Sequence, residues 1–265
     1  MLTDRQTGTL ALGAVAAALG MAALRKRPAR TRARAREYLD ASADREAPRP
    51  PTVTAARRLN RAAGLIATST LLDSSIEHYR GSFHNKAMIT PLLVSASTLA
   101  VSAHGTRDER PLAHAVRNPI YVAAALTGVV GTGFHIYNIA KRPGRFSWQN
   151  LFYGSPLGAP AAVALSGLLG YYSELLRESG PESSPRVFGM PAGRALAGFT
   201  AVGLLAPSAA AGLLHFRGAY HDPFMYVPVP VPPIAAALLA ATAVTRHREP
   251  RRLARWSLRL TARVG

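Results

Sequence analysis

Two short segments of this sequence carry the residue types best suited to binding a metal ion or a haem. The first is HYRGSFHN at residues 78–85, and the second is HFRGAYHD at residues 215–222. Met88 and Pro91 follow the first segment at the same distances at which Met225 and Pro228 follow the second. Because the His, Arg, Gly, His, Met and Pro positions all match at one fixed offset, the pattern indicates an internal duplication.

The candidate ligands are the histidines of these segments and one more at the end of another apolar run. They are His78, His84, His135, His215 and His221. A neutral imidazole is a suitable ligand for haem iron and for iron, copper or zinc ions. Since the chain has no Cys, a thiolate metal site and a disulfide framework are both excluded. The spacing matches none of the helical zinc motifs such as H-E-x-x-H.

Several neighbouring residues are candidates for supporting such a site. They are Asp73, Glu77, Arg80, Asn85, Met88, Tyr137, Arg217, Asp222 and Met225. Arg80 and Arg217 are expected to pair with haem propionates, or else with helix-end carbonyls or lipid phosphates. The two methionines would favour copper as ligands, but methionines at such positions more often only pack. Asp73 and Glu77 are four residues apart and share one helix face, which suggests a proton route or a partner for a histidine.

The sequence around these residues predicts an all-α, polytopic membrane helix bundle. It has 265 residues, is 48% hydrophobic and carries a formal net charge of +18. Basic clusters alternate with apolar runs close to the length of about 20 residues that spans a bilayer. This alternation argues against nucleic-acid binding, for which a continuous basic surface is expected. The seven predicted spans cover residues 7–24, 62–79, 86–103, 119–140, 158–176, 192–216 and 224–245.

Each histidine segment is predicted to form a tight helix–turn–helix hairpin, over residues 57–104 and 194–241. Gly81 is placed to adopt the left-handed conformation that often ends a helix. Asn85 and Asp222 are placed to cap the helices that follow. The prolines of residues 227–233 are expected to kink or unwind the outer half of the last span.

The distribution of Lys and Arg predicts the orientation in the cytoplasmic membrane. Most of the 32 basic residues fall in segments that share one side if the N-terminus is outside and the C-terminus inside. Residues 1–61 then form an anchor helix and a basic cytoplasmic loop, partly helical and partly extended. Residues 62–245 form the six-helix bundle, and residues 246–265 form a basic cytoplasmic tail. The two hairpins point the same way, which makes them a parallel repeat.

This topology places all five candidate histidines at the outer face, where the related hairpins are expected to pack together. His104, His114 and His247 fall at or near the inner face. Three hypotheses remain open. The protein is a redox subunit that binds b-type haem, or it holds iron, copper or zinc in a site that is catalytic if one coordination position is open. Alternatively, it is a non-catalytic anchor, assembly partner or transporter whose His-Arg face docks a periplasmic or membrane redox partner, an anion or a quinone.

Overall fold

The computed structural model is divided into two compact units, and the residues that it describes are helical apart from one short pair of strands. It describes residues 51–179, 186–187, 189–245, 252, 255–257 and 259. Unit 1 comprises Met1–Gly131 and Ala162–Pro185, and unit 2 comprises Thr132–Ala161 and Arg186–Gly265. The predicted first span at residues 7–24 lies outside the described residues, as does most of the predicted basic tail.

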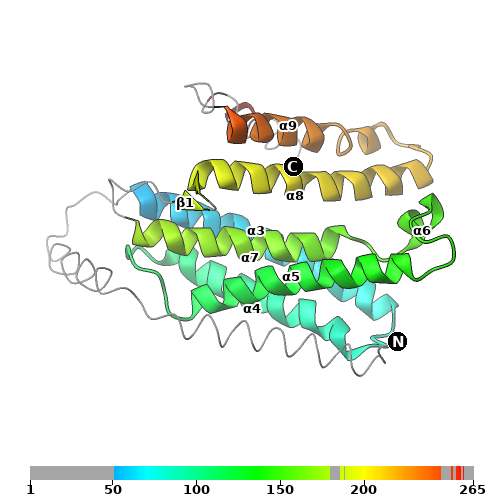
Figure 1. Cartoon of the computed structure of the whole chain (residues 1–265), viewed down its shortest axis with the longest axis horizontal. Coiled ribbons are helices and arrows are strands. Elements are labelled where there is room, and N and C mark those ends of the chain that lie inside the picture. Colours follow the sequence, from blue (N-terminus) through cyan, green and yellow to red (C-terminus); the bar gives the residue numbers. More distant parts are fainter. Residues whose placement is uncertain are drawn as a thin grey trace, which may run out of the picture. The chain divides into compact units, whose positions relative to one another are not determined.

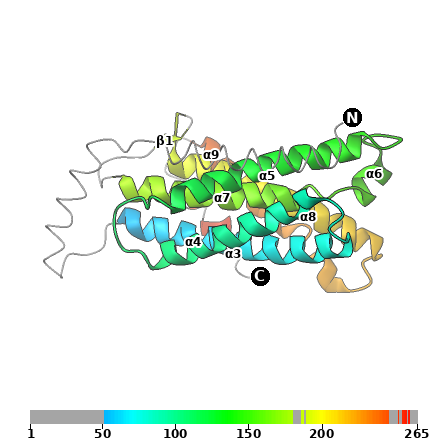
Figure 2. The same ribbon diagram turned by 90° about the horizontal axis from the view of Figure 1, so that it is seen from below.

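Unit 1 is built on two long helices that pack side by side, α3 (Pro51–Arg80) and α4 (Thr90–Arg107) (Figures 1 and 2). The buried positions of α3 recur every three or four residues, which is the period of one helix face. They are Val53, Ala56, Asn60, Ala63, Gly64, Ala67, Thr70 and Ser74. The buried positions of α4 are Thr90, Val94, Ser95, Thr98, Ser102 and Gly105. These side chains are small or polar, so the two backbones approach closely, as is common between membrane helices.

The other two helices of unit 1 also meet through small residues. They are the first part of α5 (Arg117–Ala140) and most of α7 (Gly158–Glu178). A Cβ atom added at Gly128 would lie 2.2 Å from the backbone nitrogen of Ala164. A Cβ atom at Gly170 would lie 2.2 Å from the ring of Tyr121. Both contacts are too short for any side chain, so glycine is required for this close approach.

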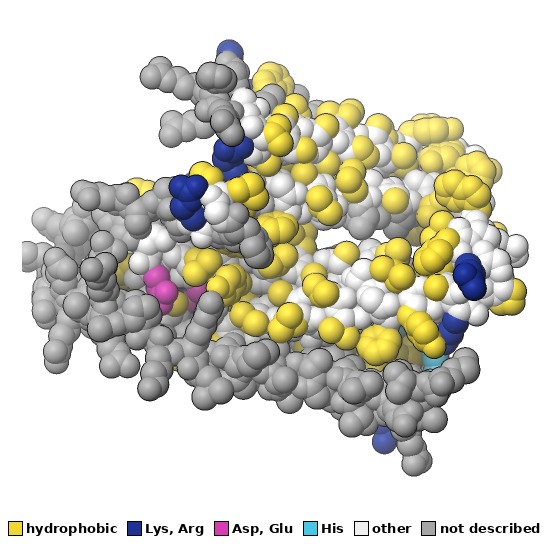
Figure 3. All heavy atoms as spheres, in the orientation of Figure 1, with side chains coloured by type: hydrophobic (Ala, Val, Ile, Leu, Met, Phe, Trp, Pro, Cys, Tyr) yellow, Lys and Arg dark blue, Asp and Glu magenta, His cyan; other side chains and the backbone are white. Residues whose placement is uncertain are grey.

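Unit 2 contains the end of α5, a short helix, a strand pair and a second long hairpin. Its elements are α6 (Trp148–Tyr153), β1 (Arg186–Val187), β2 (Met190–Pro191), α8 (Ala192–Arg217), the 3₁₀ turn η2 (Pro223–Tyr226) and α9 (Val231–Val244). The start of α8 is tied to the end of α9, because Arg194 donates from Nε to the carbonyl of Ala243 at 2.6 Å. Figure 3 shows hydrophobic side chains along the visible face of α8 and α9.

Among the described residues, three helical segments are long and apolar enough to cross a membrane. They are Lys86–Arg107, which includes the 3₁₀ turn η1 (Lys86–Ile89), Arg117–Ala140 and Pro223–Val244. Ala192–Leu205 is a shorter apolar helix. These segments match four of the predicted spans in position, and they are consistent with a membrane protein.

Two sequence predictions about helix limits have clear outcomes. The basic loop was expected to reach Arg61, but α3 already begins at Pro51. Proline is well tolerated in the first helical turn, and the buried face of α3 starts at Val53, so packing extends the helix into the basic segment. The prediction for the prolines of the last span is confirmed, because residues 227–230 interrupt the helix between η2 and α9.

Candidate functional site

The two histidine segments form turns with the same backbone hydrogen bonds. The first turn is defined as residues 78–88 and the second turn as residues 215–225. In the first turn the amide of Phe83 donates to the carbonyl of His78 at 3.0 Å. In the second turn the amide of Tyr220 donates to the carbonyl of His215, also at 3.0 Å. Each turn therefore closes over the first histidine of its segment.

The left-handed residues of both turns are the two that follow the glycine. They are Ser82 (φ 57°), Phe83 (φ 44°), Ala219 (φ 54°) and Tyr220 (φ 48°). The prediction that Gly81 is left-handed is therefore wrong, and Gly218 in the second turn has a φ of −79°. The amide of Gly81 still donates to the carbonyl of Glu77 at 3.0 Å. The helical hydrogen-bond ladder thus runs through the glycine, and the chain reverses only after it.

The predicted helix caps are confirmed in both turns. Asn85 accepts the amide of Ala87 at 2.9 Å through its Oδ1. Asp222 accepts the amide of Phe224 at 2.9 Å in the same way. The elements that they cap are the 3₁₀ turns η1 and η2. A side-chain oxygen satisfies an otherwise unpaired amide at each site, which fixes the direction in which the chain leaves the turn.

Four of the five candidate histidines direct their ring Nδ1 at a backbone carbonyl. The Nδ1 of His78 lies 2.6 Å from the carbonyl oxygen of Met88. His84 and His221 each bond the carbonyl of the glycine three residues earlier, at 3.0 Å. A carbonyl oxygen can only accept, so Nδ1 carries the proton. In the neutral ring, Nε2 then carries a lone pair instead of a proton, as in histidines that bind metals.

The fourth such histidine, His135, lies on the part of α5 that belongs to unit 2. Its Nδ1 bonds the carbonyl of Pro156, in the loop that follows α6. The guanidinium of Arg217 lies 4.4 Å from the ring centroid of Tyr153, the last residue of α6. The region of residues 153–156 therefore contacts both the end of α5 and the second turn.

The remaining predicted residues make local contacts. Glu77 and Arg80 form an exposed ion pair with an oxygen–nitrogen distance of 3.0 Å. Asp73 is exposed one helical turn before Glu77. The ammonium of Lys141 lies 5.5 Å from the ring centroid of Tyr137. None of these contacts by itself defines a ligand.

Met88 and Met225 are half-buried one turn after the second histidine of each segment. Met88 supports the first turn through its carbonyl, which receives the Nδ1 of His78. The ring centroids of His215 and Tyr220 are 6.2 Å apart in the second turn. The first turn and its two histidines belong to unit 1, whereas the second turn and His135 belong to unit 2. Within the described residues, no three His, Cys, Asp or Glu side chains are grouped so as to hold a metal ion.

Unit 1 also contains a buried ion-pair cluster, which we define as Asp108, Arg117, Glu174 and Arg177. The side chain of Arg117 is 0% exposed, and that of Glu174 is 1% exposed. Arg117 donates from Nε and Nη2 to the two oxygens of Glu174 at 2.8 and 3.0 Å. It also donates from Nη1 to Asp108 at 2.8 Å. This two-point contact between a planar guanidinium and a carboxylate is among the strongest polar contacts in proteins.

Arg177 ties the end of α4 to the loop that follows it. It donates from Nη1 to the carbonyls of Asp108 and Arg110 at 2.8 and 3.0 Å, and from Nη2 to the carbonyl of Gly105. Burial would raise the pKa of Asp108, but hydrogen bonds from Arg110 and Arg117 outweigh this effect and hold that pKa well below its usual range. Asp108 is therefore ionised whenever the unit is folded near neutral pH.

A second buried contact extends the cluster toward α3. The hydroxyl of Tyr121 donates to Oδ1 of Asn60, and it lies 3.2 Å from the hydroxyl of Ser102. Tyr121 and Asn60 are both fully buried. One phenol thus connects α3, α4 and α5, and its buried hydroxyl has the partners that burial requires.

The two histidines beside the ion-pair cluster use Nδ1 in the opposite way. His104 accepts a hydrogen bond at Nδ1 from Nη1 of Arg117 at 3.3 Å. His114 accepts at Nδ1 from the amide of Val116 at 3.2 Å. Each Nδ1 is therefore unprotonated, and the proton of the neutral ring is on Nε2. Burial and the nearby charge of Arg117 lower the pKa of His114, so its ring is neutral near pH 7.

The sequence contained only one usable sign of the ion-pair cluster. Glu174 is an acid inside a predicted span, where ionisable residues are costly and face the interior of a bundle. Arg117 lies two residues before another predicted span, but many other Arg residues flank apolar runs in this sequence. Asp108 and Arg177 were assigned to loops or loop edges. Their convergence depends on the packing of α4, α5 and α7, which residue spacing does not specify.

No protein-family model matches the chain, and no curated protein or solved structure matches it either. Its function is therefore inferred from the geometry of the candidate histidines and of the ion-pair cluster.

Proposed function

We propose that this is an integral membrane protein whose candidate histidines bind a b-type haem or a transition metal ion at the outer membrane face. The observation that carries the proposal is the direction of the imidazoles. His78, His84, His135 and His221 each hold a carbonyl oxygen with Nδ1. This contact fixes the tautomer and the ring orientation, and it leaves Nε2 as the ligand atom.

The second turn and the loop after α6 supply further groups that suit a haem. Arg217 stacks on the ring of Tyr153, and a guanidinium in this position is suited to pair with a propionate. His135 lies beside the same loop. A bound haem or metal would supply electron transfer, and the protein would tune its potential through the ligands and their hydrogen bonds. If the group is a metal ion, imidazole nitrogen suits iron, copper and zinc.

The proposal includes the finer membrane topology, with seven spans, the N-terminus outside and the C-terminus inside. It is supported by the three segments that are long and apolar enough to cross a bilayer. Exposed aromatic residues on α6, Trp148 and Tyr153, suit the membrane interface. The two turns have the same closing hydrogen bonds and similar φ angles, which supports a duplicated hairpin.

The first test is an optical and elemental measurement on the full chain. The protein is purified in detergent from cells supplied with haem precursor and trace metals. We expect a Soret band with a reduced-minus-oxidised difference spectrum, or one of iron, copper or zinc in stoichiometric amount. If neither is found, the proposal is wrong, and the alternative hypothesis of a non-catalytic anchor, assembly partner or transporter is favoured.

The second test identifies the ligands with substitutions that keep the turns intact. In His84→Asn and His221→Asn, the side-chain amide can still donate to the glycine carbonyl, but the Nε2 ligand atom is lost. We expect the occupancy or affinity for the bound group to fall by about tenfold or more for a true ligand. The matched control is His104→Asn, because His104 uses Nδ1 as an acceptor beside Arg117. An equal loss in the control would show that the effect is not ligation.

A further inference from the structure

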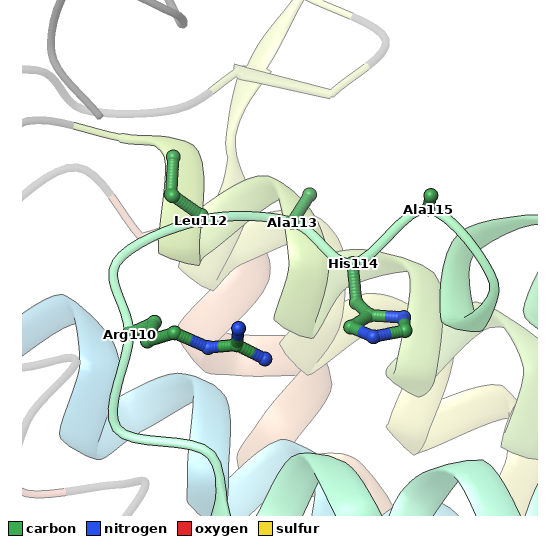
Figure 4. A pocket seen from close by; sticks show the side chains of 5 residues that line it. All are labelled: Arg110, Leu112, Ala113, His114 and Ala115. Carbon is green, nitrogen blue, oxygen red and sulfur yellow. The ribbon is translucent and has the colours of Figure 1, made fainter. Parts of the chain in front are cut away.

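A shallow pocket of about 220 Å³ lies in unit 1, in the loop between α4 and α5. It is lined by Arg110, Leu112, Ala113, His114 and Ala115. Figure 4 shows the side chains of Arg110 and His114 extending into the space that the loop encloses. The other lining residues are apolar, and their side chains point to the other side of the loop in this view.

Both polar side chains can donate hydrogen bonds into this space. Arg110 uses Nε and Nη2 to hold Asp108, at 2.9 and 3.3 Å, and its side chain is still 56% exposed. Because His114 accepts the amide of Val116 at Nδ1, its neutral ring presents an N–H at Nε2. A guanidinium and a neutral imidazole N–H together suit an anionic oxygen.

The charges around the pocket also favour an anion. Arg110 lines the pocket, and Arg177 donates to its carbonyl. Among the described residues, these two guanidiniums and that of Arg117 form ion pairs with two carboxylates, those of Asp108 and Glu174. The neighbouring acid, Glu109, forms an ion pair with Arg57 at 3.4 Å. One positive charge is therefore in excess, and part of this charge is kept from water by burial.

The position of the pocket identifies the kind of anion. The loop connects two segments that are long and apolar enough to cross a membrane, Lys86–Arg107 and Arg117–Ala140. In a bilayer, a loop between two such spans lies at the level of the lipid head groups. Basic pockets at the ends of membrane helices are suited to phospholipid phosphates. The apolar residues of the same loop, Leu112, Ala113 and Ala115, suit contact with the adjoining acyl chains.

We propose that this pocket binds the phosphate of an anionic phospholipid, with Arg110 and His114 as the donors. The proposal shares the membrane location with the proposed function, but it does not depend on haem or metal binding. A failure to bind lipid would not affect the Nδ1 hydrogen bonds of the candidate histidines. Haem and metal binding are tested separately, by the optical spectrum and the metal content.

The experiment measures lipid binding to the full chain in detergent by native mass spectrometry. The probes are phosphatidylglycerol, phosphatidylcholine and inorganic phosphate. We expect one phosphatidylglycerol to bind saturably and more tightly than phosphatidylcholine. Arg110→Gln should weaken this binding about fivefold, the effect of one basic residue on an anionic lipid. His114→Asn should also weaken it, because asparagine can replace the Nδ1 acceptor but not the Nε2 donor.

The matched control is Arg107→Gln, which removes one exposed charge from the end of α4 outside the pocket. We expect it to leave the affinity within about twofold of the wild type. An equal loss in the control, or equal binding of phosphatidylcholine, would overturn the proposal. Displacement of the lipid by millimolar inorganic phosphate would overturn the lipid assignment in favour of a soluble anion. Asp108 keeps Arg117 as a partner in Arg110→Gln; if that variant still fails to fold, His114→Asn decides the outcome.

Discussion

Four of the five candidate histidines and the two histidines beside the ion-pair cluster use the same ring atom in opposite ways. His78, His84, His135 and His221 donate from Nδ1 to backbone carbonyls. His104 and His114 instead accept at Nδ1, from a guanidinium and from an amide. The first arrangement puts the lone pair of the neutral ring on Nε2, the atom that would bind a metal, whereas the second makes Nε2 a hydrogen-bond donor. The hydrogen bond at Nδ1 thus distinguishes histidines suited to bind a metal from histidines suited to donate a hydrogen bond to an anion.

The two regions differ in burial as well. The ion pair in the first turn, between Glu77 and Arg80, has side chains that are 49% and 71% exposed. The pair between Arg117 and Glu174 is almost fully buried. Exposed pairs contribute little to stability because water screens them. A buried pair contributes mainly by fixing one arrangement, and the loss of one partner is costly because the other is left uncompensated.

The largest expected effect follows from this difference. Arg117→Met would leave the carboxylates of Asp108 and Glu174 buried without their main partner, and we expect the free energy of unfolding to fall by about 3–5 kcal/mol. The measurement is chemical or thermal unfolding in detergent. The control Arg80→Met removes a guanidinium from the exposed pair, and we expect a loss of less than about 1 kcal/mol. Equal losses would contradict the contrast in burial.

The contrast between the two sets of rings can be observed directly. We expect ¹⁵N NMR of histidine-labelled protein above pH 7 to find the proton on Nδ1 in His84 and His221, and on Nε2 in His114. The assignments come from the corresponding His→Asn variants. Free imidazole side chains favour the proton on Nε2, so the Nδ1 form in the turns would be a specific result. The same tautomer in all three residues would remove the main support for ligation.

The sequence predicted the local parts of this structure better than the distant ones. The caps at Asn85 and Asp222 and the break before α9 are local effects of side-chain oxygens and prolines, and these predictions are confirmed. Gly81 was predicted to be left-handed because glycine has the lowest cost there, but its amide still makes the last helical hydrogen bond of α3, to the carbonyl of Glu77. Ser82 and Phe83 adopt positive φ instead, because the capped segment that follows fixes the point of reversal.

In the candidate site, too, the sequence predicted local features but not contacts between distant residues. The repeated segment identified the histidines, and local bonds to the glycine carbonyls determine how two of them point. The ion-pair cluster was missed because its members come from distant parts of the chain: Asp108 from the loop after α4, Arg117 from α5 and Glu174 from α7. Among the 32 basic residues, no spacing marks the one that will be fully buried.

A smaller effect is the pH dependence of stability that His114, beside the ion-pair cluster, is expected to cause. Burial and Arg117 lower the pKa of His114. As the pH falls below the ordinary imidazole pKa of about 6.5, the unfolded chain takes up a proton that the folded ring does not. The free energy of unfolding should therefore decrease as the pH drops through that value. Asp108 adds no slope here, because its lowered pKa affects stability only below about pH 4.

The test compares the thermal unfolding midpoint between about pH 5 and pH 8 for the wild type and His114→Asn. We expect the decrease on acidification to be smaller in the variant, because it lacks the titrating ring. Identical pH profiles would show that His114 is as well solvated in the folded protein as in the unfolded chain, and would argue against its burial beside Arg117.

The smallest effect tests whether the first and second turns are equivalent. Ser82 and Ala219 hold the same position and have φ angles of 57° and 54°. A left-handed non-glycine residue costs about 1 kcal/mol, and glycine avoids this cost but adds entropy to the unfolded chain. We therefore expect Ser82→Gly and Ala219→Gly each to stabilise the protein by roughly 0.5 kcal/mol, as measured by chemical unfolding. If one substitution raises the free energy of unfolding and the other lowers it, the two turns do not carry the same backbone strain despite their matching hydrogen bonds. They would then be separate structures that share a sequence pattern.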